Sequence, residues 1–221
     1  MTTEPSPPPP APTAAETRPP ARGRLFVISG PSGVGKDTVL VELHRLLPDV
    51  VRCVTATTRA PRPNEVEGRD YLFLSVPQFR EMVEAEAFLE YARVNGNLYG
   101  TPRAWVEQQR ALGHDVLLKI DVQGGLTVRT RARDAVLIFL KPPTVAELER
   151  RLRARSTETE EQITTRLLDA RSELQQMPNY DFAVVNDRVE HAADLIRAII
   201  LAERCRIHDG TPSVPWSDPH V

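Results

Sequence analysis

Residues 29–38 read SGPSGVGKDT, and this stretch decides the fold. It follows the apolar run LFVI at residues 25–28, which is typical of a strand buried inside a sheet. It precedes apolar residues that recur at helical spacing between Val39 and Leu47. A strand, a glycine-rich turn, a lysine and a helix in this order predict an α/β protein with a P-loop.

The glycines of this turn let backbone N–H groups approach a phosphate closely, because glycine has no Cβ. The helix N-terminus and Lys36 add positive charge at the same point. The alternative is a glycine-rich turn that binds no nucleotide. We expect a phosphate-binding loop formed by Gly30, Pro31, Ser32, Gly33, Val34, Gly35, Lys36, Asp37 and Thr38.

One position of the loop departs from the usual pattern. A Ser or Thr hydroxyl normally follows the lysine and holds Mg²⁺, whereas here the next residue is Asp37 and Thr38 comes one later. A carboxylate is also a good Mg²⁺ ligand, but it adds negative charge beside a polyphosphate.

Composition limits the class of protein. A chain of 221 residues suits one α/β domain, and a net charge of −2 gives no electrostatic case for a nucleic-acid or acidic-membrane partner. Cys53 and Cys205 lack metal-ligand spacing and are typical of reduced thiols, so we expect a cytoplasmic protein. No apolar run approaches the roughly 20 residues that span a bilayer.

Both ends of the chain differ from the middle. Residues 1–22 are rich in proline and predict a disordered tail, with a proline-rich recognition segment as the alternative. Residues 208–221 predict a second loose tail, which leaves one folded domain at residues 23–207.

Residues 55–101 predict a small, mostly antiparallel insertion. Arg59 and Arg62 lie three residues apart and would repel each other unless an anion such as phosphate lies between them, although a solvated basic loop is the alternative. A hairpin at residues 88–101 would place Glu90, Tyr99 and Thr101 toward a pocket, unless Glu90 is an exposed strand carboxylate. Thr101 also has the character of a helix N-cap, because Pro102 follows it.

Two later segments carry candidate residues. Asp121 follows the apolar run VLLKI, so it would lie at the carboxyl end of a parallel strand as a ligand for substrate or Mg²⁺, or cap the next helix. Residues 144–170 predict two helices joined by a polar turn. Their Arg151, Arg155 and Arg166 could close over a triphosphate, or form ordinary ion pairs with neighbouring glutamates.

In sum these motifs resemble the guanylate kinase family over residues 24–205. The matching strings are GPSGVGKDT at 30–38, TATTRAPRPNEVEGRDYLF at 55–73, FLEYA at 88–92, NLYGT at 97–101, IDVQG at 120–124 and RSTETEEQITTRL at 155–167. The resemblance implies a three-layer α/β/α fold with a central parallel sheet, a GMP-binding insertion at about 55–101 and a helical lid at about 144–170. It also implies phosphoryl transfer from ATP to GMP with Mg²⁺, giving ADP and GDP, in purine nucleotide metabolism and GMP recycling.

The resemblance assigns roles position by position. The residues implied to hold the GMP phosphate are Arg59, Arg62, Tyr71 and Tyr99. Those implied to recognise guanine are Thr55, Glu90 and Thr101, with Asp121 near GMP and the metal. Those implied to brace the ATP phosphates are Lys36, Arg151, Arg155 and Arg166, and Asn186 falls near adenine. Asp37 and Asp121 are the implied metal ligands.

Three positions depart from the family pattern. Asp37 replaces a small or hydroxyl residue, Lys119 replaces a frequent acidic residue, and Ser156 replaces the glycine after the lid arginine. Two other functions therefore stay open, a sugar-phosphate kinase on the same fold and a non-catalytic interaction module. Glu90 with its neighbours disfavours the first, and Gly35 with Lys36 disfavours the second.

Overall fold

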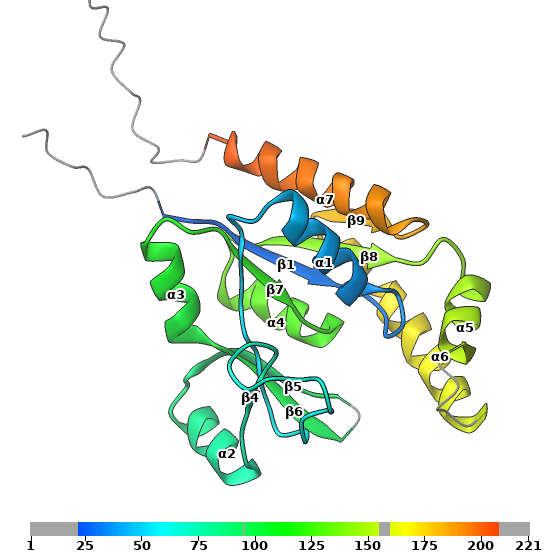
Figure 1. Ribbon diagram of the computed structural model, residues 1–221, viewed down its shortest axis with the longest axis horizontal. Coiled ribbons are helices and arrows are strands. Elements are labelled where there is room, and N and C mark those ends of the chain that lie inside the picture. Colours follow the sequence, from blue (N-terminus) through cyan, green and yellow to red (C-terminus); the bar gives the residue numbers. More distant parts are fainter. Residues whose placement is uncertain (1–21, 95, 155–159, 208–221) are drawn as a thin grey trace, which may run out of the picture.

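The centre of the molecule is a parallel sheet. The computed structural model describes residues 22–94, 96–154 and 160–207. The five strands pair in parallel in the order β2-β7-β1-β8-β9. Their bounds are Leu25–Ser29 (β1), Val51–Arg52 (β2), Val116–Lys119 (β7), Val136–Lys141 (β8) and Phe182–Val185 (β9). Because the strands are parallel, their carboxyl ends meet at one edge, where β1 passes into the glycine-rich loop (Figure 1).

Helices cover both faces of this sheet, so the predicted three-layer α/β/α fold is confirmed. Helices α1 (Lys36–Leu46) and α7 (Val189–Arg204) pack on the face that includes Phe26. Helices α3 (Arg103–Ala111) and α4 (Val122–Arg131) lie on the opposite face (Figure 1). Every residue of β1 is buried, because successive side chains of a central strand enter the two different cores.

A second sheet forms the insertion. Its four strands pair in the order β4-β3-β6-β5, antiparallel except for β3 with β4. They span Ala56–Thr57 (β3), Leu72–Phe73 (β4), Phe88–Val94 (β5) and Asn97–Pro102 (β6). Helix α2 (Val76–Glu84) begins at a capping box of Ser75 and Gln78, and its Phe79 packs on Phe88 in a small separate core.

A helical arm projects from the other side of the sheet. Helices α5 (Val145–Arg153) and α6 (Glu160–Gln175) pack through Leu148, Leu152 and Ala170, and a short 3₁₀ helix, Met177–Asn179, follows them. Figure 1 shows this arm and the insertion on either side of the loop between β1 and α1.

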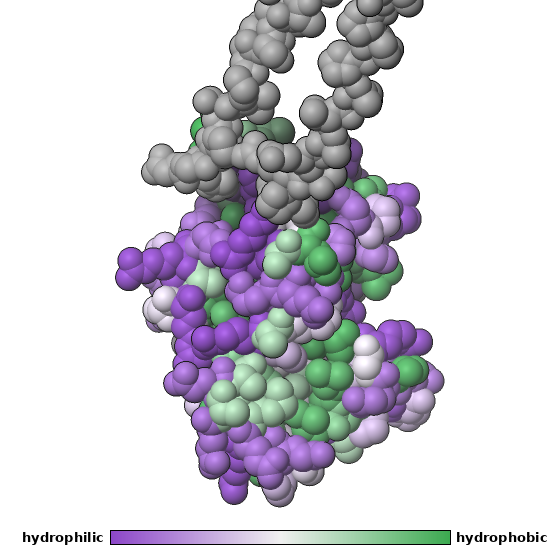
Figure 2. Space-filling model, turned by 90° about the vertical axis from the view of Figure 1, so that its left-hand side faces the viewer, coloured by the Kyte–Doolittle hydropathy of each residue, from purple (hydrophilic) through white to green (hydrophobic). Residues whose placement is uncertain are grey.

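The surface over the insertion is mixed. Viewed from the side of α2 and α3, hydrophilic side chains surround patches of hydrophobic ones (Figure 2). None of the helices in the described part of the chain has the length and apolar character that crossing a membrane requires.

One cap prediction is wrong. Thr101 is not the N-cap of α3, because it belongs to β6 and pairs across the hairpin with Glu90. Pro102 is the N-cap and offers no side-chain hydrogen bond. The predicted tails lie outside the described residues except for Arg22, which forms an ion pair with Glu107.

Candidate functional site

The glycine-rich loop is held by close backbone packing. Gly35 has a φ of 98°, and a Cβ there would lie 2.6 Å from Nδ2 of Asn186. A Cβ on Gly30 would lie 2.1 Å from the carbonyl oxygen of Leu140. Lys36 folds back over the loop, and its ammonium group donates to the carbonyls of Gly30 (2.5 Å) and Pro31 (3.1 Å). Burial removes water from the Lys36 ammonium group and lowers its pKa to about 8.

Two residues from distant segments hold the same loop at Val34. Asn186, which follows β9, donates to the carbonyl of Val34 at 2.7 Å, and its own Oδ1 is buried without a partner among the described residues. Arg151 of α5 donates to the carbonyls of Val34 (3.2 Å) and Asn186 (3.0 Å), and it also binds Glu147. Arg151 therefore reaches the loop and also makes an ion pair within its own helix.

The structure describes two of the three candidate arginines of the arm. Arg151 reaches the loop, whereas Arg166 lies on α6 and Arg155 lies outside the described residues. Their convergence over a triphosphate therefore stays a prediction.

A cavity lies between the loop and the insertion. One wall comes from the loop and α1, the opposite wall from the insertion, and the base from the end of β7 and from α6. Its lining residues are Gly30, Ser32, Lys36, Asp37, Thr55, Tyr71, Glu90, Val94, Tyr99, Lys119, Ile120, Asp121 and Glu173. The structure thus brings the predicted Thr55, Tyr71, Glu90, Tyr99 and Asp121 together with Lys36.

Glu90 is a buried carboxylate on the insertion side of this cavity. It is 2% exposed, so the alternative of an exposed strand carboxylate is wrong. The hydroxyl of Thr101 donates to its Oε1 at 2.5 Å. Burial raises the pKa of Glu90 to about 7, although the Thr101 hydrogen bond opposes the shift. Gly124 leaves the space that this carboxylate occupies, since a Cβ there would lie 2.7 Å from Oε2.

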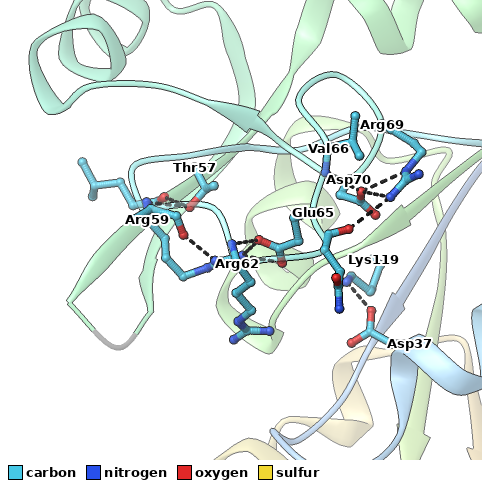
Figure 3. Close-up of polar contacts among 12 residues, drawn as sticks. Asp37, Thr57, Arg59, Arg62, Glu65, Val66, Arg69, Asp70 and Lys119 are labelled. Atoms are coloured by element: carbon cyan, nitrogen blue, oxygen red, sulfur yellow. Dashed lines mark hydrogen bonds and ion pairs between the residues drawn. The ribbon is translucent and has the colours of Figure 1, made fainter.

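The basic loop of the insertion neutralises part of its own charge. Arg59 makes a two-pronged ion pair with Glu65, with distances of 2.8 and 2.9 Å from its Nη2 (Figure 3). The guanidinium also lies 5.3 Å from the ring centre of Tyr71, which itself packs edge-on against Tyr99. Arg62 donates only its backbone N–H to Glu65, and its side chain extends away from that carboxylate (Figure 3).

Two further carboxylates line the cavity beside the loop. Asp37, in the first turn of α1, forms an ion pair with Lys119 at 2.5 Å (Figure 3). Partial loss of water contact raises the pKa of Asp37, but the charge and hydrogen bond of Lys119 outweigh this effect, so the net shift is downward. Asp121 caps α4 by accepting a hydrogen bond from the N–H of Gly124 at 2.8 Å, so the predicted cap is confirmed.

Comparison with known proteins agrees with this geometry. The sequence model of the family described as guanylate kinase matches residues 22–203. The chain belongs to the guanylate kinase family. A guanylate kinase of Desulfitobacterium hafniense is 48% identical over 185 residues, which cover 84% of this chain and 92% of that protein. One from Caldanaerobacter subterraneus is 45% identical over 186 residues, covering 84% and 90%.

A solved structure gives the same result. The crystal structure of guanylate kinase from Anaplasma phagocytophilum superposes with a TM-score of 0.71 and 34% identity, covering 85% of this chain and 89% of that one. The resemblance to guanylate kinases in the sequence motifs is therefore confirmed.

Three polar residues of this guanylate kinase family member were not assigned a role from the sequence. Glu65 and Lys119 are engaged by Arg59 and Asp37. Glu173 of α6 lines the cavity with a buried Oε2 that has no hydrogen-bond partner among the described residues. Burial raises the pKa of Glu173, and Lys36 opposes that shift. A sequence signal existed for Glu173, because it lies one helical turn beyond the buried Ala170 on α6.

Proposed function

We propose that this protein transfers the terminal phosphoryl group of ATP to GMP, giving ADP and GDP, as the guanylate kinase family implies. One observation carries the proposal: a buried carboxylate suited to guanine, Glu90, lines the same cavity as the P-loop lysine, Lys36. One cavity therefore holds a group that can recognise the base of one nucleotide and a loop that can bind the phosphates of another, as a reaction between two nucleotides requires.

The insertion supplies the proposed acceptor site. The carboxylate of Glu90 can accept hydrogen bonds from both the N1–H and the exocyclic amine of guanine, with Thr55 and Thr101 beside it. Adenine has no such pair of donors on that edge, so a buried Glu90 would be left unpaired and AMP would be rejected. Arg59, Arg62, Tyr71 and Tyr99 are proposed to bind the GMP phosphate. The geometry of the Arg59 guanidinium supports this role, because its paired donors match phosphate oxygens once Arg59 leaves Glu65.

The loop and the arm supply the proposed donor site. Backbone N–H groups from Gly30 to Thr38 would hold the ATP phosphates, and Asn186 lies near the loop on the side proposed for adenine. Lys36, Arg151, Arg155 and Arg166 are proposed to brace the phosphates. Closure of the arm over the cavity would exclude water and add positive charge where the transfer develops negative charge.

The donor set fits a Mg²⁺ ion that arrives with ATP. Mg²⁺ is usually bound through one or two carboxylates together with substrate phosphates, and Asp37 and Asp121 both line the cavity. The described residues contain no group of three or more His, Cys, Asp or Glu that could hold a metal by themselves. Bound Mg²⁺ would neutralise charge on the phosphates, and Asp37 and Asp121 are the residues proposed to hold it.

The residues would act by positioning and charge neutralisation. The attacking atom is a phosphate oxygen of GMP, which is already ionised, so no general base is needed. The free thiols of Cys53 and Cys205 agree with a reducing compartment, and we propose the cytoplasm.

The test is ADP release from ATP and Mg²⁺ with GMP, AMP, UMP and ribose 1,5-bisphosphate offered separately. We expect strong turnover with GMP alone. Turnover only with the sugar phosphate would contradict the assignment of Glu90, and no turnover with any acceptor would favour a binding role.

A further inference from the structure

Lys119 is the last residue of β7, and it lines the cavity. The side chain is 15% exposed. Its ammonium group lies 2.5 Å from Oδ1 of Asp37 and 5.7 Å from the ring centre of Tyr71. Figure 3 shows it between the loop that carries Arg59 and the helix that carries Asp37.

This position lies between the two proposed phosphate sites. On one side, Tyr71 also packs against the guanidinium of Arg59 at 5.3 Å, where the acceptor phosphate would bind. On the other side, Asp37 directly follows Lys36, the lysine of the donor loop. Lys119 is close enough to Lys36 to lower its pKa. The phosphoryl group would cross this space during transfer.

The ammonium group of Lys119 can donate more hydrogen bonds than it makes among the described residues. A lysine ammonium carries three donors, and among the described residues its one hydrogen-bond partner is Asp37. The side chain of Asp37 is 79% exposed, so water competes with this pair. Two like charges, Lys36 and Lys119, in one cavity are stabilised by an anion between them. A phosphate group is the anion that this enzyme would bind there.

We propose that Lys119 is a further phosphate-contacting residue of the transfer site, and that Asp37, in addition to its proposed contact with Mg²⁺, positions the Lys119 ammonium group at the junction of the two nucleotide sites. This inference rests on the proposed function. A phosphate oxygen of GMP forms a bond to the terminal phosphorus of ATP, the bond from that phosphorus to the bridging oxygen breaks, and the electron pair leaves with ADP. The Lys119 ammonium group would neutralise charge on the phosphoryl group in transit.

The main test is Lys119→Met in the full chain. We expect kcat with GMP to fall by about 100-fold, as on removal of one donor to a transition-state oxygen. The KM values for GMP and ATP should rise by less than about threefold, because the contact strengthens only in the transition state. Lys119→Arg should recover about tenfold of the loss, since it retains the charge with a different shape.

Asp37→Asn tests the positioning role. At saturating Mg²⁺ it should lower kcat by about fivefold. The double variant Asp37→Asn/Lys119→Met should then be no slower than Lys119→Met alone, because residues that act as one unit are not additive. Arg45→Met is the matched control. It removes the same charge from an exposed pair with Glu42 on α1, outside the cavity, and should leave kcat unchanged.

The outcomes separate the alternatives. Full activity of Lys119→Met, or losses in the two single variants that multiply in the double, would overturn the proposal. A lowered melting temperature in both variants with normal kcat would show a purely structural ion pair and would also overturn it. A higher Mg²⁺ requirement in Asp37→Asn, with kcat fully restored at saturating Mg²⁺, would show that Asp37 acts through the metal alone and would overturn its positioning role. If the parent protein itself fails with GMP, the proposed function fails, and that result is distinct from all of these.

Discussion

The two walls of the cavity are built in different ways. On the donor wall, the loop is held by backbone contacts, by glycines without room for a Cβ, and by Asn186 bound to Val34. On the acceptor wall, side chains are held by one another, Arg59 by Glu65 and Glu90 by Thr101. In the proposed function, the backbone of the donor loop is therefore formed before its ligand arrives, and only Lys36 has to leave the carbonyls of Gly30 and Pro31. The side chains proposed for the acceptor site must exchange their internal partners for ligand atoms.

Gly35→Ala should break the donor wall and have the largest effect. Gly35 has a left-handed φ of 98° and faces Asn186 at 2.6 Å, so a methyl group would displace the loop. We expect the affinity for ATP, measured by calorimetry, to fall by about 100-fold, because small displacements of binding groups have effects of this size. Gly96→Ala is the control, because Gly96 has a similar φ of 81° but no atom within 4 Å of the added Cβ. Equal losses in both variants would show that backbone strain, and not the contact, is responsible.

Glu90→Gln should affect only the acceptor wall. The amide cannot accept two hydrogen bonds from guanine, and a bond to a charged group contributes about 1.5–3 kcal/mol. We expect kcat/KM for GMP to fall by about 30-fold while the Kd for ATP stays the same. If both nucleotides lose affinity equally, Glu90 does not recognise guanine.

The pH dependence of GMP binding gives a second test of the acceptor wall. Burial raises the pKa of Glu90 to about 7, above its usual 4.5, so the folded protein holds this proton and loses stability as pH rises from about 4.5 to about 7. Guanine donors require the ionised form, so the Kd for GMP should rise by about tenfold per pH unit below 7.

Glu90→Gln is the reference in that titration. The GMP phosphate also titrates, near pH 6, and it does so with either protein, whereas residue 90 titrates only in the parent protein. An identical pH profile in the parent protein and in Glu90→Gln would contradict the assignment.

Glu65→Gln should have the smallest effect on binding. It removes the partner of Arg59, whose side chain is 16% exposed, so the free energy of unfolding should fall by about 1 kcal/mol. The Kd for GMP should improve by about twofold, because Arg59 no longer has to leave a carboxylate. Denaturant titration and calorimetry measure the two effects. Weaker GMP binding would mean that Glu65 orients Arg59 for the phosphate.

The donor wall was largely predictable from the sequence, and the acceptor wall only in part. The glycine-rich loop follows from local spacing, and so do the strand before it and the helix after it. The hairpin pattern also predicted that Glu90 and Thr101 face a pocket, but a local cap signal before Pro102 gave Thr101 the wrong structural role. The register between the two strands determines the role of Thr101, because its hydroxyl donates to Glu90 and is not available to cap α3.

The charge pairs could not be predicted for a different reason. Asp37 and Lys119 are 82 residues apart, and both were also plausible partners of a metal or a phosphate. Only the parallel order of β1 and β7, which brings their carboxyl ends together, places these side chains in contact. Glu65 had several arginines within reach in its own loop, so its choice of Arg59 depends on how that loop folds.

The contact between Arg151 and the glycine-rich loop has a mechanical consequence. Arg151 links α5 to the carbonyls of Val34 and Asn186, so the arm and the glycine-rich loop share hydrogen bonds. A rotation of α5 that kept these hydrogen bonds would therefore displace the loop proposed to hold the donor phosphates. Conversely, a nucleotide that stiffens the loop also limits the directions in which the arm can travel.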